Sequence, residues 1–156
     1  MRKYFPSAFI TGAEINRRSL AACRRRKADE RIAFIYSDRT AVAKRGPFDA
    51  IFCMAVLQRT PHAIAERGVT DLSRIYPFEK FDRQLRELDA LLEKDGLLVI
   101  HHSQYLFEDA CVASKYMPLE TGAPEAGAGP RFGRNSQRLA DSAGAAPASI
   151  FVKVRA

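Results

Sequence analysis

Short apolar runs alternate with more polar stretches along the first third of the chain. Residues 8–14, 31–36 and 48–54 are mostly apolar, and each run is six or seven residues long. Runs of this length are typical of strands that are buried on both faces of a parallel sheet. Asn16 is a favourable N-cap for a helix over residues 17–27, because its side chain can accept hydrogen bonds from the first backbone N–H groups. The pattern therefore predicts a strand, a helix and two further strands.

The clearest helical pattern lies between Pro77 and Gly96. Apolar residues recur there at spacings of four, three and four, which places them in one stripe on a helix: Phe81, Leu85, Leu88 and Leu92. Proline suits the first helical position, and we expect Asp95-Gly96 to end the helix. The remaining pattern predicts a loop with a short helix at 60–76, a flexible connection at 121–130, and strands at 97–101, 116–119 and 150–155.

Strands that alternate with helices predict an α/β domain with a mostly parallel sheet and helices on both faces. The length of 156 residues fits a single domain spanning residues 1–156. In sheets of this kind, ligands bind beyond the carboxyl ends of the strands. Glu14, Asp38 and His101 lie at the ends of predicted strands. These strand ends are therefore the expected place of a site.

Positive charge is concentrated in one predicted helix. The chain has a formal net charge of +7, and six basic residues lie close together at Arg17, Arg18, Arg24, Arg25, Arg26 and Lys27. Such a run is either the solvated face of a surface helix or a contact surface for nucleic acid or another acidic partner. No aromatic residue lies among these arginines, which argues against base stacking. Nucleic acid is therefore a possible partner that the sequence does not favour.

Cysteine usage and hydropathy indicate a cytoplasmic chain. Cys23, Cys53 and Cys111 are far apart and form no CxxC pair or Cys/His cluster, so we expect free thiols and no metal site. No apolar run reaches the length of a membrane span, and no signal peptide is visible. We expect no membrane contact.

Residues 10–16, Ile-Thr-Gly-Ala-Glu-Ile-Asn, followed by a helix, resemble the second strand of the class I (Rossmann-like) S-adenosylmethionine-dependent methyltransferases. In that family the strand ends in an acidic residue that holds the ribose hydroxyls of the cofactor. The resemblance implies that Glu14 is this ribose ligand, with Ile15 beside it. It also implies that Asp38 accepts a hydrogen bond from the adenine amine, with Ser37 and Arg39 flanking the ring.

Two later segments are similar to the same family. Residues 48–57 resemble its next strand and the turn that lies along the methionine part of the cofactor, which implies contacts from Cys53, Met54 and Ala55. Residues 81–100 resemble its next helix and strand, with Lys-Asp-Gly where many members have Pro-Gly-Gly. The last two predicted strands fit its C-terminal antiparallel pair.

The resemblance departs from the family at the N-terminus. The family's first strand ends in a glycine-rich loop that lies against the cofactor, and residues 1–6 resemble the end of the helix after that loop. The expected fold is therefore a Rossmann-like sheet without the family's first strand. We expect such a chain to be poorly stable, to rearrange, or to need the additional segment.

The implied function is transfer of a methyl group from S-adenosylmethionine to an acceptor that the sequence does not identify, whether small or macromolecular. His101 and His102, at a strand end, are candidates for a general base or are structural, and Tyr105 is a further candidate. Glu14 and Asp38 could instead act as polar caps, and Cys53 as a small buried residue. The alternative function is a non-catalytic remnant or binding module that contacts an acidic partner through residues 17–27.

Overall fold

The computed structural model describes residues 3–27, 29–58, 68, 71–119 and 149–155. The chain forms two compact units, Met1–Pro47 and Phe48–Ala156. One domain spanning residues 1–156 stays a prediction.

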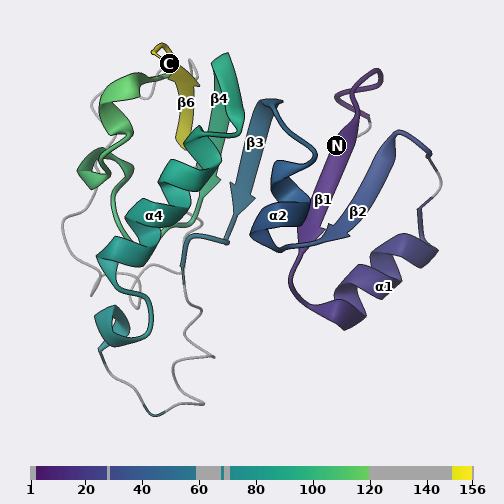
Figure 1. The fold of residues 1–156 in the computed structure, drawn as a ribbon, viewed down its shortest axis with the longest axis horizontal. Helices are drawn as coiled ribbons and strands as arrows, with labels where there is room; N and C mark the ends of the chain where they lie inside the picture. The colour runs from purple at the N-terminus through teal and green to yellow at the C-terminus, as the bar shows by residue number, and fades with distance from the viewer. Residues whose placement is uncertain (1–2, 28, 59–67, 69–70, 120–148, 156) are drawn as a thin grey trace, which may run out of the picture. The chain divides into compact units, whose positions relative to one another are not determined.

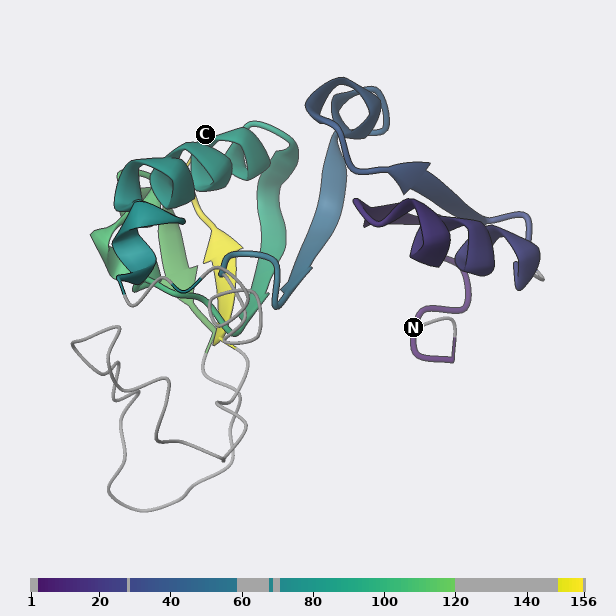
Figure 2. The ribbon, with the colours of Figure 1, turned by 90° about the horizontal axis from the view of Figure 1, so that it is seen from below.

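The first unit is built on two parallel strands. β1 (Ile10–Glu14) pairs with β2 (Ile32–Tyr36), and Glu14 lies opposite Tyr36 in the register (Figure 1). The helix α1 (Arg17–Arg25) connects the two strands and lies along one face of the pair (Figure 2). Both predicted strands are confirmed. The helix begins where expected and ends two residues earlier than the predicted 17–27, with Arg26 as its C-cap.

A short helix that the apolar pattern does not predict follows β2. α2 (Arg39–Ala43) begins after Asp38, whose side chain accepts a hydrogen bond from the backbone N–H of Ala41 at 2.9 Å. Aspartate is among the preferred N-cap residues because its carboxylate satisfies an otherwise unpaired backbone donor. The N-cap signal was present in the sequence, but the helix is too short to show an apolar stripe.

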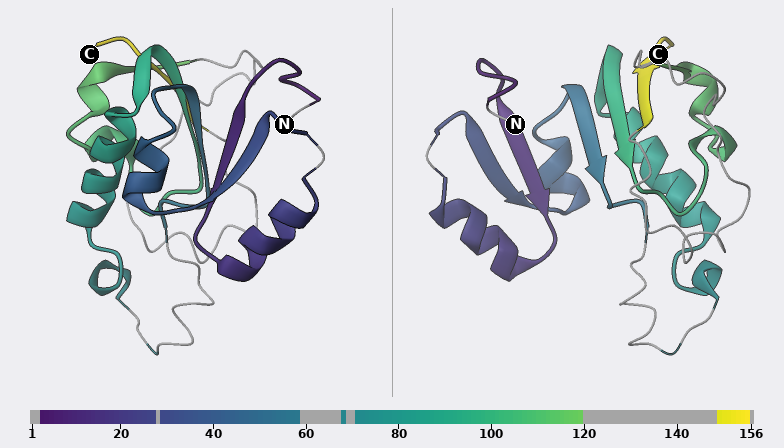
Figure 3. Two further views of the ribbon diagram at one scale, coloured as in Figure 1. Left: turned by 45° about the vertical axis from the view of Figure 1, so that its right-hand side comes forward. Right: turned by 180° about the vertical axis from the view of Figure 1, so that it is seen from behind.

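The second unit contains a four-stranded sheet in the order β3-β4-β6-β5. Its strands are β3 (Phe48–Met54), β4 (Leu92–His101), β5 (Tyr116–Pro118) and β6 (Ser149–Lys153). β3 is parallel to β4, whereas β6 is antiparallel to both β4 and β5 (Figure 3). The short 3-10 helices η1 (Leu72–Arg74), η2 (Phe107–Asp109) and η3 (Ala113–Lys115) belong to the same unit. The predicted C-terminal antiparallel pair is confirmed, although β6 ends at Lys153 rather than residue 155.

The predicted end of the long helix is wrong. α4 (Phe78–Asp89) stops six residues before Asp95, and β4 has already begun at Leu92. Residues 93–96 form a bulge, because the register with β3 passes from Phe48↔Leu92 to Ala50↔Leu97. Asp95 there adopts a positive φ of 64°. The Asp-Gly signal thus marks a bulge in a strand rather than a helix C-terminus.

The core of the second unit lies between α4 and the sheet (Figure 2). Phe81 and Leu85 of α4 are fully buried against Leu98, Ile100 and Phe151 of the sheet. Phe81 and Leu85 belong to the apolar stripe that the sequence predicts, so the buried face of α4 is the predicted one.

A buried ionic cluster closes the C-terminal end of α4. The Lys153 Nζ lies 3.1 Å from Asp89 Oδ1 and donates to the carbonyl oxygens of Asp89 and Leu92 at 2.7 and 2.9 Å. Asp89 also accepts hydrogen bonds from Lys115 Nζ and Tyr116 OH, each at 2.9 Å. Lys153 thus satisfies two carbonyl groups near the helix end and pairs with the buried carboxylate.

Both units combine helices with strands, so the fold class is α/β; the sheet of the first unit is parallel and that of the second is mixed. The prediction of parallel strands is confirmed for the pairs β1–β2 and β3–β4, but these pairs belong to two separate sheets rather than to one mostly parallel sheet, and in the larger sheet β6 is antiparallel to both of its neighbours. The connection predicted at 121–130 and most of the segment at 60–76 lie outside the described residues; within the latter, η1 agrees with the expected short helix.

Candidate functional site

Polar residues gather at the carboxyl edge of the β1–β2 pair. Glu14 ends β1, and Ser37 and Asp38 directly follow β2. The Ser37 backbone N–H donates to the Glu14 carbonyl oxygen at 3.1 Å, which continues the strand pairing beyond Tyr36. The parallel register therefore brings the two predicted adenosine-binding carboxylates to the same edge of one sheet.

Both carboxylates also stabilise the local backbone. Glu14 Oε1 accepts from the Asn16 N–H at 2.7 Å, and Asn16 caps α1 by accepting from the N–H groups of Arg18 and Ser19. Asp38 caps α2 through its Oδ1. The second oxygen of each carboxylate makes no hydrogen bond with the described part of the chain. The cap alternative is therefore confirmed for one oxygen of each, and the other oxygen remains able to accept from a ligand.

The other adenosine-binding candidates of the first unit lie on its surface. Ile15 is 70% exposed, and Ser37 and Arg39 are exposed at the start of α2. An exposed isoleucine directly after Glu14 offers an apolar surface for a flat ring, although single exposed apolar side chains are common in proteins. Their contacts with a cofactor stay predictions.

The second unit has its own cluster of residues at the carboxyl ends of β3 and β4. The Ala55 N–H donates to the His101 carbonyl oxygen at 2.8 Å, directly after the paired residues Met54 and His101. Ala55 and His102 adopt positive φ angles of 56° and 58°. Left-handed backbone is uncommon for residues other than glycine, and such strain clusters at functional sites. The strand ends of the second unit are therefore also a candidate site.

Cys53 differs from its neighbours because its side chain belongs to the core. The thiol is 4% exposed, and burial raises its pKa to about 12. A thiol with such a pKa is not a nucleophile near neutral pH, so the interpretation of Cys53 as a small buried residue is confirmed. The three residues that follow, Met54, Ala55 and Val56, are exposed, with Met54 at 54% and Val56 at 55%, so their side chains are open to a ligand.

The two histidines contact each other at the end of β4. Their ring centroids lie 4.0 Å apart at an interplanar angle of 87°, and both side chains are half-buried. Imidazole is the side chain best suited to accept a proton near neutral pH. The edge-to-face contact fixes the orientation of the two rings relative to each other.

Tyr105 is part of an aromatic cluster rather than an open site. Its hydroxyl donates to the Tyr76 carbonyl oxygen at 2.7 Å, and its ring lies 5.4 Å from the rings of Phe78 and Phe81. Burial raises the pKa of Tyr105, outweighing the hydrogen bond from Gln104 that lowers it. These contacts favour a structural role for Tyr105.

Gln104 was not recognised from the sequence. It is 6% exposed, and its amide Nε2 donates to the Tyr76 carbonyl oxygen at 3.3 Å. Its Oε1 is buried and has no hydrogen-bond partner among the described residues. Nothing in the local sequence distinguishes this glutamine from an exposed one, because only the tertiary contact with Tyr76 and Leu57 buries it.

The structure thus places the predicted residues in two groups. Glu14, Ile15, Ser37, Asp38 and Arg39 lie in the first unit, whereas Cys53, Met54, Ala55, His101 and His102 lie in the second. That both groups of residues bind the same cofactor stays a prediction.

Within the described ranges, no three His, Cys, Asp or Glu side chains converge in a way that could hold a metal ion. In the same residues, no helix has the length and apolar character needed to cross a membrane. Comparisons with protein-family models, with curated proteins and with solved structures found no match for this chain.

Proposed function

We propose that this chain binds S-adenosylmethionine and serves in transfer of its methyl group, as in the class I methyltransferases that the sequence resembles. The observation that carries the proposal is the shared position of Glu14 and Asp38 after two neighbouring parallel strands. Each carboxylate has one oxygen in a backbone cap and one without a hydrogen bond to the described residues. Two acceptors at one sheet edge suit the donors of an adenosine.

The strand directions of the second unit also support the proposal. The order β3-β4-β6-β5, with β6 antiparallel to its neighbours, agrees with the C-terminal antiparallel pair that the resemblance implies.

The residues present fit the adenosine end of the cofactor by their chemistry. A carboxylate accepts hydrogen bonds from two adjacent hydroxyls, so Glu14 would hold the ribose diol and Asp38 the adenine amine. Ile15, Ser37 and Arg39 would line the ring. When bound, the cofactor supplies an electrophilic methyl group on its sulfonium.

The second unit would contribute contacts and a base. Met54 and Ala55 would lie along the methionine part, and His101 or His102 would accept a proton from an acceptor that needs deprotonation.

Calorimetric titration with S-adenosylhomocysteine tests the proposal. We expect binding to the full chain and an affinity loss of about tenfold to a hundredfold for Glu14→Gln, because a hydrogen bond to a charged group contributes about 1.5–3 kcal/mol. Gln retains an oxygen for the Asn16 N–H, so the α1 cap should persist. Glu93→Gln, an exposed position on β4, is the matched control and should bind like the parent chain.

A 2′-deoxy analogue of the ligand separates ribose recognition from a general loss of fold. The parent chain should bind the analogue more weakly than S-adenosylhomocysteine, whereas Glu14→Gln should distinguish the two ligands much less. Absence of binding by the parent chain would refute the proposal. Equal discrimination by the parent chain and Glu14→Gln would refute the role of Glu14.

A further inference from the structure

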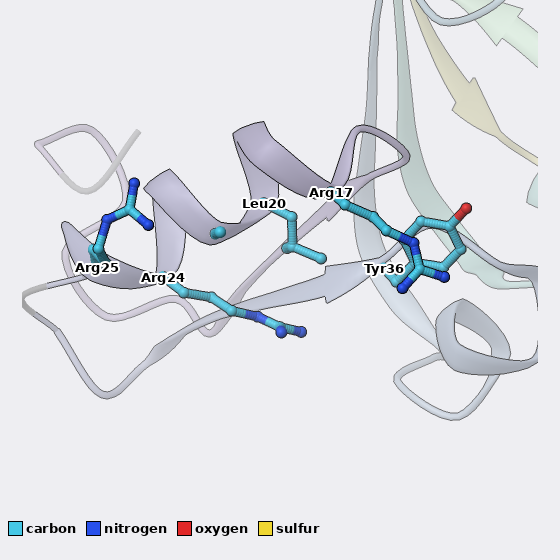
Figure 4. Close-up of a pocket in the computed structure, with 6 residues that line it drawn as sticks. Arg17, Leu20, Arg24, Arg25 and Tyr36 are labelled. Carbon is cyan, nitrogen blue, oxygen red and sulfur yellow. The ribbon is translucent and has the colours of Figure 1, made fainter.

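The first unit contains a basic groove between α1 and β2. It has a volume of about 460 Å³ and is lined by Arg17, Leu20, Ala21, Arg24, Arg25 and Tyr36 (Figure 4). Arg17, Leu20, Ala21 and Arg24 are spaced by three, one and three residues, so they share one face of the helix. Arg17 and Tyr36 lie at one end of the groove, and Arg24 and Arg25 lie toward the other.

The groove combines positive charge with an aromatic ring. The Arg17 guanidinium lies over the Tyr36 ring, 4.9 Å from its centroid. Arg17 and Arg24 are seven positions apart on the helix, which is about 10.5 Å along the axis at about 1.5 Å per residue. The segment that carries the arginines has no aromatic residue, but the fold places Tyr36 of β2 beside them. The sequence argument against base stacking therefore does not hold for the folded unit.

The charge distribution of α1 favours an anionic ligand. The first turn holds Arg17 and Arg18 and no acidic residue. The N-terminal end of a helix carries partial positive charge, so two arginines there repel the helix dipole. The Glu14 carboxylate, which accepts from the N–H of the N-cap residue Asn16, offsets part of this repulsion, and a phosphate near Arg17 would offset more of it.

We propose that this groove binds single-stranded nucleic acid, with phosphates on the arginines and a base stacked at the Arg17–Tyr36 end. A volume of this size is within the range of about 300–1,000 Å³ found for small-ligand pockets, so it can accept one nucleotide but not a duplex. Planar guanidinium and phenol groups are stacking surfaces for a base, and apolar Leu20 and Ala21 lie between the charges. An acidic peptide would use the arginines but would have no need of the ring.

This inference does not depend on the proposed transferase activity. The groove lies entirely within the first unit, and none of its lining residues is among the candidate cofactor ligands.

The experiment measures fluorescence anisotropy of a labelled oligouridylate of about 12 nucleotides, because single-strand affinity falls with salt by about 0.7 log units per log unit for each phosphate contact. We expect Arg17→Ala/Arg25→Ala to weaken binding at least tenfold and to lower the salt slope by about 1.4, which is two contacts. The matched control, Arg83→Ala/Lys94→Ala, removes two charges from exposed positions of the second unit and should leave both values close to those of the parent chain. Arg24 is left intact because its Nε donates to the Phe34 carbonyl oxygen at 3.1 Å.

A second pair of variants tests stacking. Tyr36→Phe keeps the ring and should bind like the parent chain, whereas Tyr36→Leu should lose at least fivefold, since base–aromatic stacking contributes about 1–3 kcal/mol. Circular dichroism establishes that each variant is folded. Equal weakening by the two double variants, unchanged binding by Tyr36→Leu, or equally tight binding of a labelled polyglutamate would overturn the proposal.

Discussion

Replacement of Lys153 by methionine tests whether the buried ionic cluster stabilises the second unit. Lys153 is 6% exposed, and its ammonium group has three partners: the Asp89 carboxylate and the carbonyl oxygens of Asp89 and Leu92. Methionine has a similar length and no charge, so it fills much of the space but leaves all three acceptors without this donor. The substitution therefore removes the polar interactions with little loss of volume.

The expected loss in the free energy of unfolding is about 3 kcal/mol. Removal of one partner of a buried ion pair destabilises a protein by about 3–5 kcal/mol, because the other charge is left uncompensated. Asp89 keeps its hydrogen bonds from Lys115 and Tyr116, which places the expected value at the lower end of that range.

Urea unfolding monitored by far-ultraviolet circular dichroism measures the change. Lys94→Met is the matched control, because Lys94 is exposed on β4 and should alter the free energy of unfolding by no more than about 0.5 kcal/mol. If Lys153→Met shifts the transition no more than Lys94→Met does, the cluster contributes no net stability and the reasoning is refuted.

Three further predictions concern the second unit. Burial raises the pKa of Asp89, but hydrogen bonds from Lys115, Lys153 and Tyr116 outweigh this effect and hold the pKa below its ordinary value. The ionised carboxylate therefore stabilises the fold above about pH 3.9, and this contribution is lost as the pH falls through the lower pKa of the folded state. The stability difference between the parent chain and Asp89→Asn, measured by urea unfolding, should therefore shrink from pH 5 to pH 2, and a constant difference would contradict this. Gly96→Ala should lower the free energy of unfolding by about 1–3 kcal/mol in the same assay, because a Cβ there would lie 2.8 Å from the Glu93 carbonyl oxygen; an unchanged midpoint would contradict the close contact. Ellman's reagent, followed by peptide mapping, should modify exposed Cys111 in the folded chain and buried Cys53 only after unfolding, and equal rates for Cys53 in both states would exclude its burial.

The apolar pattern predicted most elements of the fold but not all their ends. The buried face of α4 follows from the stripe that contains Phe81 and Leu85, because a helix must bury its apolar side. The end of that helix was misplaced because Leu92 continues the stripe and yet begins β4. An apolar residue at helical spacing is equally suited to a strand, and only the pairing of Leu92 with Phe48 decides between them.

Some features of the candidate site could likewise be predicted from the sequence, and others could not. The positions of Glu14 and Asp38 at strand ends were predictable, because the runs before them are apolar and the parallel register follows from the fold class. Their second use as caps was predictable in kind from the residue types. The burial of Gln104 and the positive φ angles of Ala55 and His102 were not, since these depend on contacts between distant segments.

By itself, the sequence determined the alternation of strands and helices, the buried faces and the run of arginines on α1. These properties are local, because they depend on residue spacing and on the chemistry of single side chains. Only the tertiary structure decided which residues from separate segments meet. The pairing of β1 with β2 brings Tyr36 to Arg17, and the packing of β6 brings Lys153 to Asp89. Local spacing predicts neither contact, because Arg17 and Tyr36 are 19 positions apart along the chain and Asp89 and Lys153 are 64 positions apart.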